Sequence, residues 1–248
     1  MKTRYIPMTL AGILHTALIL SPLNAAVTVD PLEIDGGNSY TFKTTYNNPS
    51  GSAHTSRSAG ILAYADEIGT AVTYSNGTSE GYVIAQNATD VVIKFDFTNT
   101  SYQATGFNFE AGFGKSGAAD KSVSLSYYYK LSEAGSWVHI DGADKSGTSF
   151  PGWPSLSTGV VSSFAASQEV YFKVAFTVES GAGLRWAYEN PNAFAGGSAG
   201  ALLGKGNGFG IQFDLAAVPE PATGAMFLGI LTLLISFVIW RHNNQRHL

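Results

Sequence analysis

The chain has 248 residues with 14 Lys and Arg against 18 Asp and Glu, a formal net charge of −4 and no cysteine. The lack of cysteine excludes a disulfide framework, a cysteine-ligated zinc site and a thiol nucleophile. The mild acidity, without a basic stripe interleaved with aromatic residues, argues against nucleic-acid binding.

The first segment has the pattern of a secretory signal peptide. Lys2 and Arg4 precede an apolar stretch over Met8–Leu20, and small residues follow that suit cleavage after Ala25 or Ala26. The stretch is short for a membrane anchor, which is the alternative interpretation. We therefore predict a signal peptide over residues 1–26 and a mature chain outside the cytoplasm.

Residues 27–217 have the size and composition of one β-rich domain. They are rich in Gly, Ser, Thr and aromatic residues and poor in charge, which favours sheet. Four segments alternate with period 2, and their apolar residues are Val91, Ile93, Phe95 and Phe97; Val123, Leu125, Tyr127 and Tyr129; Val170, Phe172, Val174, Phe176 and Val178; and Phe209, Ile211, Phe213 and Leu215. Weaker strands are expected at Val27–Ile34, Tyr40–Tyr46, Gly81–Gln86, Thr105–Glu110, Trp137–Asp141 and Leu184–Tyr188.

Strands with one apolar face are typical of antiparallel sheets. About ten of them predict an all-β fold, an antiparallel two-sheet sandwich of the jelly-roll type, with other β-sandwiches as the alternative. Two segments, His54–Thr70 and Asn190–Asn207, are expected to be long loops, although Ile61–Ile68 could form a short helix.

The central domain resembles discoidin-like or galactose-binding-like jelly rolls. The resemblance depends on the hairpin of Tyr127–Lys130 and Trp137–Ile140, and on the later strand Val170–Val174. It implies the same sandwich fold, but fold alone does not supply a function.

Catalytic groups are hard to assemble from this sequence. The domain keeps two histidines, His54 and His139, and has no Gly-x-Ser-x-Gly or His-Glu-x-x-His motif. The acids that a glycosidase could use fall on solvated strand faces or in loops, so we expect surface charges at Asp96, Glu110, Glu179, Glu189 and Asp214. The segment Asp141–Gly147 fails the EF-hand pattern. No cofactor is predicted, a structural calcium ion is left open, and the metal ligands are unknown.

Aromatic residues give the better indication of a ligand site. Trp153 lies in a proline-bounded loop, and Arg185, Trp186 and Tyr188 lie near the end of a predicted strand. Aromatic faces can stack on sugar rings while Arg donates hydrogen bonds to hydroxyl groups. These four are the tentative ligand-binding residues. In the alternative, Trp153 closes one end of the sandwich and Trp186 belongs to the core.

The last 31 residues, 218–248, have a tripartite organisation. Val218 and the tripeptide Pro219-Glu220-Pro221 are followed by an uncharged apolar run over Ala222–Trp240 and by a basic tail over residues 241–248. A helix of that length spans roughly 28 Å, close to the thickness of a bilayer core. Arg241 and Arg246 follow it, and cations there favour the cytoplasmic side. We therefore predict one C-terminal transmembrane helix over residues 222–240.

This ending resembles the PEP-CTERM sorting signal of Gram-negative bacteria. The resemblance implies an exosortase as partner, an inner-membrane intermediate, and release or transfer to the cell surface or the extracellular space. It also implies an association with exopolysaccharide and biofilm. A plain C-terminal anchor is the alternative.

We therefore expect an exported, non-enzymatic surface or matrix protein. A carbohydrate-binding module that holds a polysaccharide is the first alternative, and a secreted hydrolase is the second. The expected partners are an exosortase, the membrane before processing and a polysaccharide.

Overall fold

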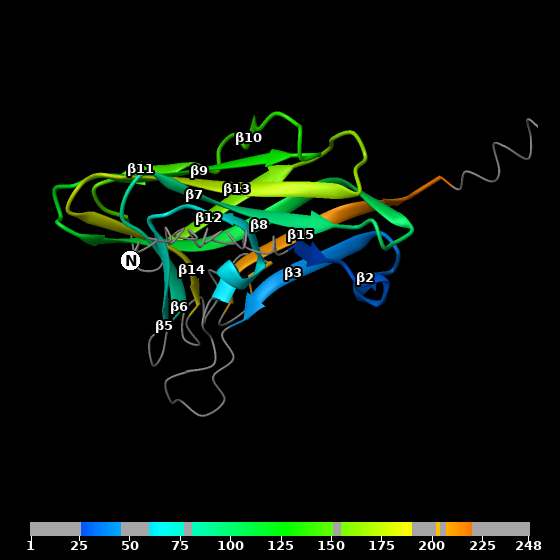
Figure 1. Cartoon of the computed structure of the whole chain (residues 1–248), viewed down its shortest axis with the longest axis horizontal. Helices are drawn as coiled ribbons and strands as arrows, with labels where there is room; N and C mark the ends of the chain where they lie inside the picture. Colours follow the sequence, from blue (N-terminus) through cyan, green and yellow to red (C-terminus); the bar gives the residue numbers. More distant parts are fainter. Residues whose placement is uncertain are drawn as a thin grey trace, which may run out of the picture.

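In the computed structural model, residues 26–45, 60–76, 81–150, 155–189, 202–203 and 207–219 are described. These residues form an all-β structure of two sheets stacked as a sandwich (Figure 1). Within these ranges the only helices are two short 3₁₀ turns, η1 (Pro31–Glu33) and η2 (Gly60–Tyr64). No helix in the described ranges is long and apolar enough to cross a membrane. The predicted signal peptide before Ala26 and the predicted transmembrane segment 222–240 lie outside these ranges.

The first sheet, as far as it is described, contains seven strands. Its main path is β1 (Ala26–Thr28), β7 (Thr89–Asp96), β13 (Glu169–Val178), β9 (Val123–Lys130) and β10 (Val138–His139). The short strands β4 (Ala65–Ile68) and β11 (Lys145–Gly147) pair with β7 and β9.

The second sheet contains eight described strands. Its order is β2 (Ile34–Asp35), β3 (Ser39–Thr45), β15 (Asn207–Ala217), β8 (Tyr102–Gly117), β14 (Ala182–Glu189), β6 (Gly81–Ala85) and β5 (Val72–Asn76), and β12 (Ser155–Val161) also pairs with β8.

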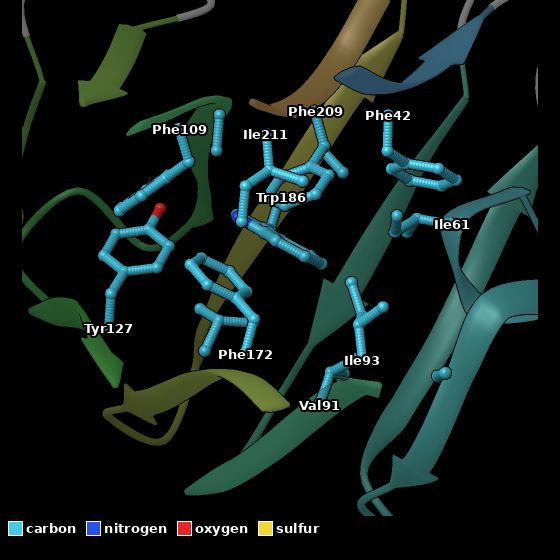
Figure 2. Close-up of a cluster of buried hydrophobic side chains, with 14 of the residues drawn as sticks. Phe42, Ile61, Val91, Ile93, Phe109, Tyr127, Phe172, Trp186, Phe209 and Ile211 are labelled. Atoms are coloured by element: carbon cyan, nitrogen blue, oxygen red, sulfur yellow. The ribbon is translucent and has the colours of Figure 1, made fainter. Parts of the chain in front are cut away.

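The core lies between the sheets and is rich in aromatic rings (Figure 2). Trp186 is fully buried, with its ring centroid 5.4 Å from that of Phe209 and 6.0 Å from that of Phe176. Phe172 packs against Phe209 at 5.4 Å and Phe109 at 4.9 Å. Tilted and edge contacts of this kind add to the burial of apolar area. The four alternating segments predicted as strands supply a large share of the core side chains, and their inward faces are confirmed, with Tyr129 only partly buried.

The structure corrects several predicted elements at the N-terminal side. The expected strand Val27–Ile34 is broken, because Pro31 lacks an N–H for the ladder and Asp30 caps η1 by accepting a hydrogen bond from Leu32 N at 2.9 Å. Its first part, β1, pairs with β7 in parallel rather than antiparallel fashion. The expected loop His54–Thr70 contains η2 and β4 from residue 60 onward, and Ile61 is fully buried.

Other differences concern strand lengths. β8 extends far beyond the predicted Thr105–Glu110, where residues 111–114, an Ala-Gly-Phe-Gly run, are all buried and interrupt the alternation of buried and exposed residues. The predicted strand Trp137–Asp141 shrinks to β10, and β5, β11 and β12 were not predicted.

Candidate functional site

The four tentative ligand-binding residues do not form one site. Trp186 points into the core between the sheets, where no ligand can reach it, so its assignment to a ligand site is wrong (Figure 2). Its neighbour Leu184 is also fully buried, as expected for residues two apart in a strand. Trp153 lies outside the described residues.

Arg185 and Tyr188 both contact a third residue, Tyr82. The Arg185 guanidinium is 4.5 Å from the centroid of the Tyr82 ring, and the rings of Tyr82 and Tyr188 stack at 5.7 Å. Ala187, with a φ of 51°, marks a shift in the register between β14 and β6. Both tyrosines are buried, with 8% and 3% of their surface exposed, so their faces are not available for stacking on a sugar.

A different site crosses the outer face of the second sheet. Four adjacent strands, β3, β15, β8 and β12, carry two rows of outward side chains around a hollow of about 290 Å³. The strand register places Thr41, Gln212, Asn108 and Val160 in one row, and Lys43, Gly210, Glu110 and Thr158 in the other. We call this hollow with its lining residues the strand groove.

Gly210 allows Leu202 and Leu203 to pack closely and form one wall of the strand groove. A Cβ atom at this position would lie 3.2 Å from Leu203 Cδ2 and 3.3 Å from Leu202 Cγ, so the absent side chain lets both leucines pack over β15. Glu110 fixes this wall, because its Oε2 accepts a hydrogen bond from Leu203 N at 2.7 Å. The predicted loop Asn190–Asn207 thus contributes Leu202 to the lining.

The lining offers both donors and acceptors. The amides of Asn108 and Gln212 and the hydroxyls of Thr41 and Thr158 can each donate and accept hydrogen bonds. The Lys43 ammonium only donates, and the Glu110 carboxylate only accepts. Gln212 Nε2 donates to Thr41 Oγ1 at 3.2 Å, which orients the amide. Val160 is 69% exposed and adds an apolar surface. A concave site with several convergent polar groups and some apolar wall suits a small polyhydroxylated ligand.

The described lining of the strand groove does not contain the carboxylate pair of a glycosidase. Glu110 is the one carboxylate among the described residues that line it. Asp214 faces the same side of the sheet, four residues along β15 from Gly210, the partner of Glu110. That offset corresponds to about 13 Å of strand, whereas the two carboxylates of glycosidases lie roughly 5 to 9.5 Å apart.

Two of the other predicted acids, Glu179 and Asp96, have hydrogen-bond partners. Glu179 accepts hydrogen bonds from Ser122 N at 2.9 Å and from Lys121 at 2.9 Å, which lower its pKa to about 2. Asp96 accepts from Thr98 N at 2.9 Å. Both are partly or fully exposed, which agrees with their interpretation as surface charges.

His139 is exposed at the edge of the first sheet. Its Nδ1 lies 3.0 Å from Asp141 Oδ1, and its Nε2 lies 3.0 Å from Asp144 Oδ1. Across the described ranges no group of three or more His, Asp or Glu side chains is arranged to hold a metal ion. The structural calcium ion that the sequence leaves open, with no ligands assigned, stays a prediction.

No family model matches the chain, and neither does any curated protein. Among solved structures, it is similar to a mutant carbohydrate-binding module of family 29, with 13% identity over 60% of this chain and 88% of the other and a TM-score of 0.35. A second mutant of that family, complexed with mannohexaose, has 11% identity over 60% and 87% of the two chains and a TM-score of 0.33. A third has 12% identity over 73% and 92%, with a TM-score of 0.32. TM-scores this low do not establish a common fold.

Proposed function

We propose that this chain is an exported, non-enzymatic carbohydrate-binding module, and that the strand groove holds a segment of a neutral polysaccharide. We also propose that the two-sheet sandwich is of the jelly-roll type, as expected from the sequence. One observation carries the binding proposal: hydrogen-bonding side chains from four adjacent strands, six of the eight positions in the two rows, face a common hollow. Sugar hydroxyl groups are both donors and acceptors, and this mixed lining matches them.

The test is binding of the full chain, in mild detergent, to a panel of soluble neutral polysaccharides that contains β-glucan, mannan, galactan and xylan. Calorimetry with Asn108→Ala/Gln212→Ala measures the contribution of the amides. Each lost hydrogen bond is worth about 0.5 to 1.5 kcal/mol, so the double variant should bind roughly ten times more weakly.

Thr177→Ala is the matched control, because Thr177 is exposed on the first sheet, away from the strand groove. It should bind like the wild type, and all three proteins should melt at similar temperatures. Absence of binding across the panel, or full binding by the double variant, would refute the strand groove as the glycan site.

We also propose that the C-terminal region is an exosortase sorting signal that delivers the module to the cell surface or the extracellular matrix. The observation that favours this is where the domain stops: β15 ends at Ala217, Val218 N donates to Ser101 O at 2.9 Å, and Pro219 is exposed. Pro219, the first residue of the tripeptide, thus follows directly after β15 and the backbone contact of Val218. Glu220, Pro221, Arg241 and Arg246 lie outside the described residues.

The sorting proposal predicts a role for Glu220 beyond spacing. Two prolines around one acid keep the backbone extended, and Glu220 adds a charge that a cationic subsite can bind. Glu220→Ala keeps the prolines and the apolar run, so a plain anchor would behave normally. A sorted protein would accumulate uncleaved in the inner membrane. The mass and fraction of the mature protein, in a host with its exosortase, distinguish the two.

A further inference from the structure

The outer face of the first sheet alternates lysine and aromatic side chains across three strands. Tyr171 on β13 lies opposite Lys94 of β7 and Lys130 of β9. In the next row, Lys173 of β13 lies opposite Tyr128 of β9. Trp137, which immediately precedes β10, completes the group. We call these six residues the aromatic–lysine face: Lys94, Tyr128, Lys130, Trp137, Tyr171 and Lys173.

Two of the lysines meet on one indole ring. Lys130 Nζ lies 4.9 Å from the centroid of Trp137 and 4.7 Å from that of Tyr171. Lys173 Nζ lies 4.4 Å from the centroid of Trp137 and 4.8 Å from that of Tyr128. The negative faces of the rings attract these ammonium groups and hold them at defined positions. Trp137 is half-buried, so part of it remains open to solvent.

The two ammonium groups at Trp137 form no salt bridge in the described part of the chain. Lys94, by contrast, forms a salt bridge with Glu169 at 2.7 Å. No described carboxylate lies within salt-bridge distance of Lys130 or Lys173, and Lys130 donates one hydrogen bond, to the Glu133 carbonyl at 2.7 Å. An ammonium group has three donors. Two ammonium groups with spare donors are therefore concentrated beside Trp137, and the described carboxylate of Asp66 interacts with Lys130 only at longer range than a salt bridge.

We infer that the aromatic–lysine face is a second binding surface, and that it takes an acidic polysaccharide whose sugar units carry carboxylates. Carboxylates form strong, charge-assisted hydrogen bonds with lysine, and the apolar face of a sugar ring packs on an aromatic side chain. The face combines both features at one point, which fits an acidic sugar better than it fits a ligand that is only charged or only apolar. The strand groove lies on the other sheet, so this inference does not depend on it.

The test uses the full chain in mild detergent with polygalacturonate as the acidic probe. The double variant Lys130→Gln/Lys173→Gln should bind at least tenfold more weakly than the wild type. Lys130→Arg/Lys173→Arg keeps the charge and the ring contacts and should bind normally. Added salt should weaken binding by the wild type, because it screens exposed charges.

Two controls separate the site from general charge. Lys115→Gln/Lys121→Gln removes two positive charges elsewhere and should leave the affinity within twofold of the wild type. Asn108→Ala/Gln212→Ala, in the strand groove, should also leave it unchanged. Trp137→Ala should weaken polygalacturonate binding at low salt. If the lysine charges alone bound the polymer, this variant would keep the wild-type affinity.

Three results would overturn the inference. The first is equal binding of polygalacturonate by the wild type and by Lys130→Gln/Lys173→Gln. The second is equal loss in Lys115→Gln/Lys121→Gln. The third is binding of duplex DNA or of vesicles with anionic phosphatidylglycerol as tightly as polygalacturonate, because the face would then recognise negative charge and not sugar.

Discussion

Two polar atoms in the core have no hydrogen-bond partner among the described residues: the Tyr127 hydroxyl and Trp186 Nε1. Burial raises the pKa of Tyr127, although the nearby side chains of Ser157 and Trp186 oppose that rise. Ser157 Oγ uses its proton elsewhere, in a hydrogen bond to the Ala143 carbonyl at 2.6 Å. A buried hydroxyl without a partner costs free energy of folding.

Tyr127→Phe removes that hydroxyl and should raise the free energy of unfolding by about 1 kcal/mol. Urea denaturation of the full chain measures the change. Tyr171→Phe is the control, because the Tyr171 hydroxyl lies close to the Lys94 ammonium and its removal should not stabilise the fold. If Tyr127→Phe destabilises by more than about 1 kcal/mol, the hydroxyl has a partner after all, such as a buried water molecule.

At His139 the prediction concerns pH. Hydrogen bonds to Asp144 and then to Asp141 raise the pKa of the ring above its ordinary value, which is about 6.5. A raised pKa in the folded state means that the charged ring stabilises the fold. This contribution is fully present below the unfolded pKa and is lost as the pH rises through the folded pKa.

The urea midpoint of the wild type should therefore fall more steeply than that of His139→Gln as the pH rises from about 6 to 8.5. Titration of the ring protons by NMR, assigned with the same variant, should give a pKa above the ordinary value. Parallel stability curves for the two proteins would show that the carboxylates do not hold the charged ring.

At the scale of elements, β12 packs closely on β8 because Gly159 has no side chain. A Cβ atom at this position would collide with the ring of Phe109, which is buried. Gly159→Ala should destabilise the fold by roughly 1 to 3 kcal/mol. Chemical denaturation measures the change, with Thr158→Ala as the control. The Thr158 side chain points outward, so its removal should change the free energy of unfolding by less than about 0.5 kcal/mol. Equal stability of the two variants would mean that β12 can move away without cost.

The same elements explain what could be read from the sequence. β7, β9, β13 and β15 were predicted because their buried and exposed residues alternate, and that pattern is local. β12 was missed because Gly159 takes an inward position where alternation requires an apolar side chain. The core position of Trp186 is the alternative stated from the sequence, and it agrees with the spacing of two residues between Trp186 and the buried Leu184.

The strand groove could not be predicted in the same way. Thr41, Asn108, Thr158 and Gln212 come from four strands that are far apart in the chain, and each by itself is an ordinary outward polar residue. Only the strand register brings them together. Gly210, the last residue of the Gly208-Phe209-Gly210 run, indicates that another part of the chain packs closely on this strand, but it does not identify that part.

At the scale of the whole molecule, the sandwich should fold without its tail. The buried core of the described residues runs from Val27 to Leu215, and the inner faces of the two sheets bury one another. A chain limited to residues 27–217 should give a β-type far-UV spectrum and one cooperative melt within a few degrees of the full chain. A product that is disordered or aggregated in several buffers would show that the flanking segments take part in the fold.

The position of β15 decides how the sandwich responds to mechanical load. This strand lies between β3 and β8, pairs with both, and leads directly into the tail. If the tail is held while a bound polymer is pulled by flow, tension runs along β15. Antiparallel hydrogen bonds lie across the strands, so both ladders must shear together, whereas an edge strand such as β5 would peel one bond at a time. Single-molecule pulling should therefore require more force from Pro219 than from Val72.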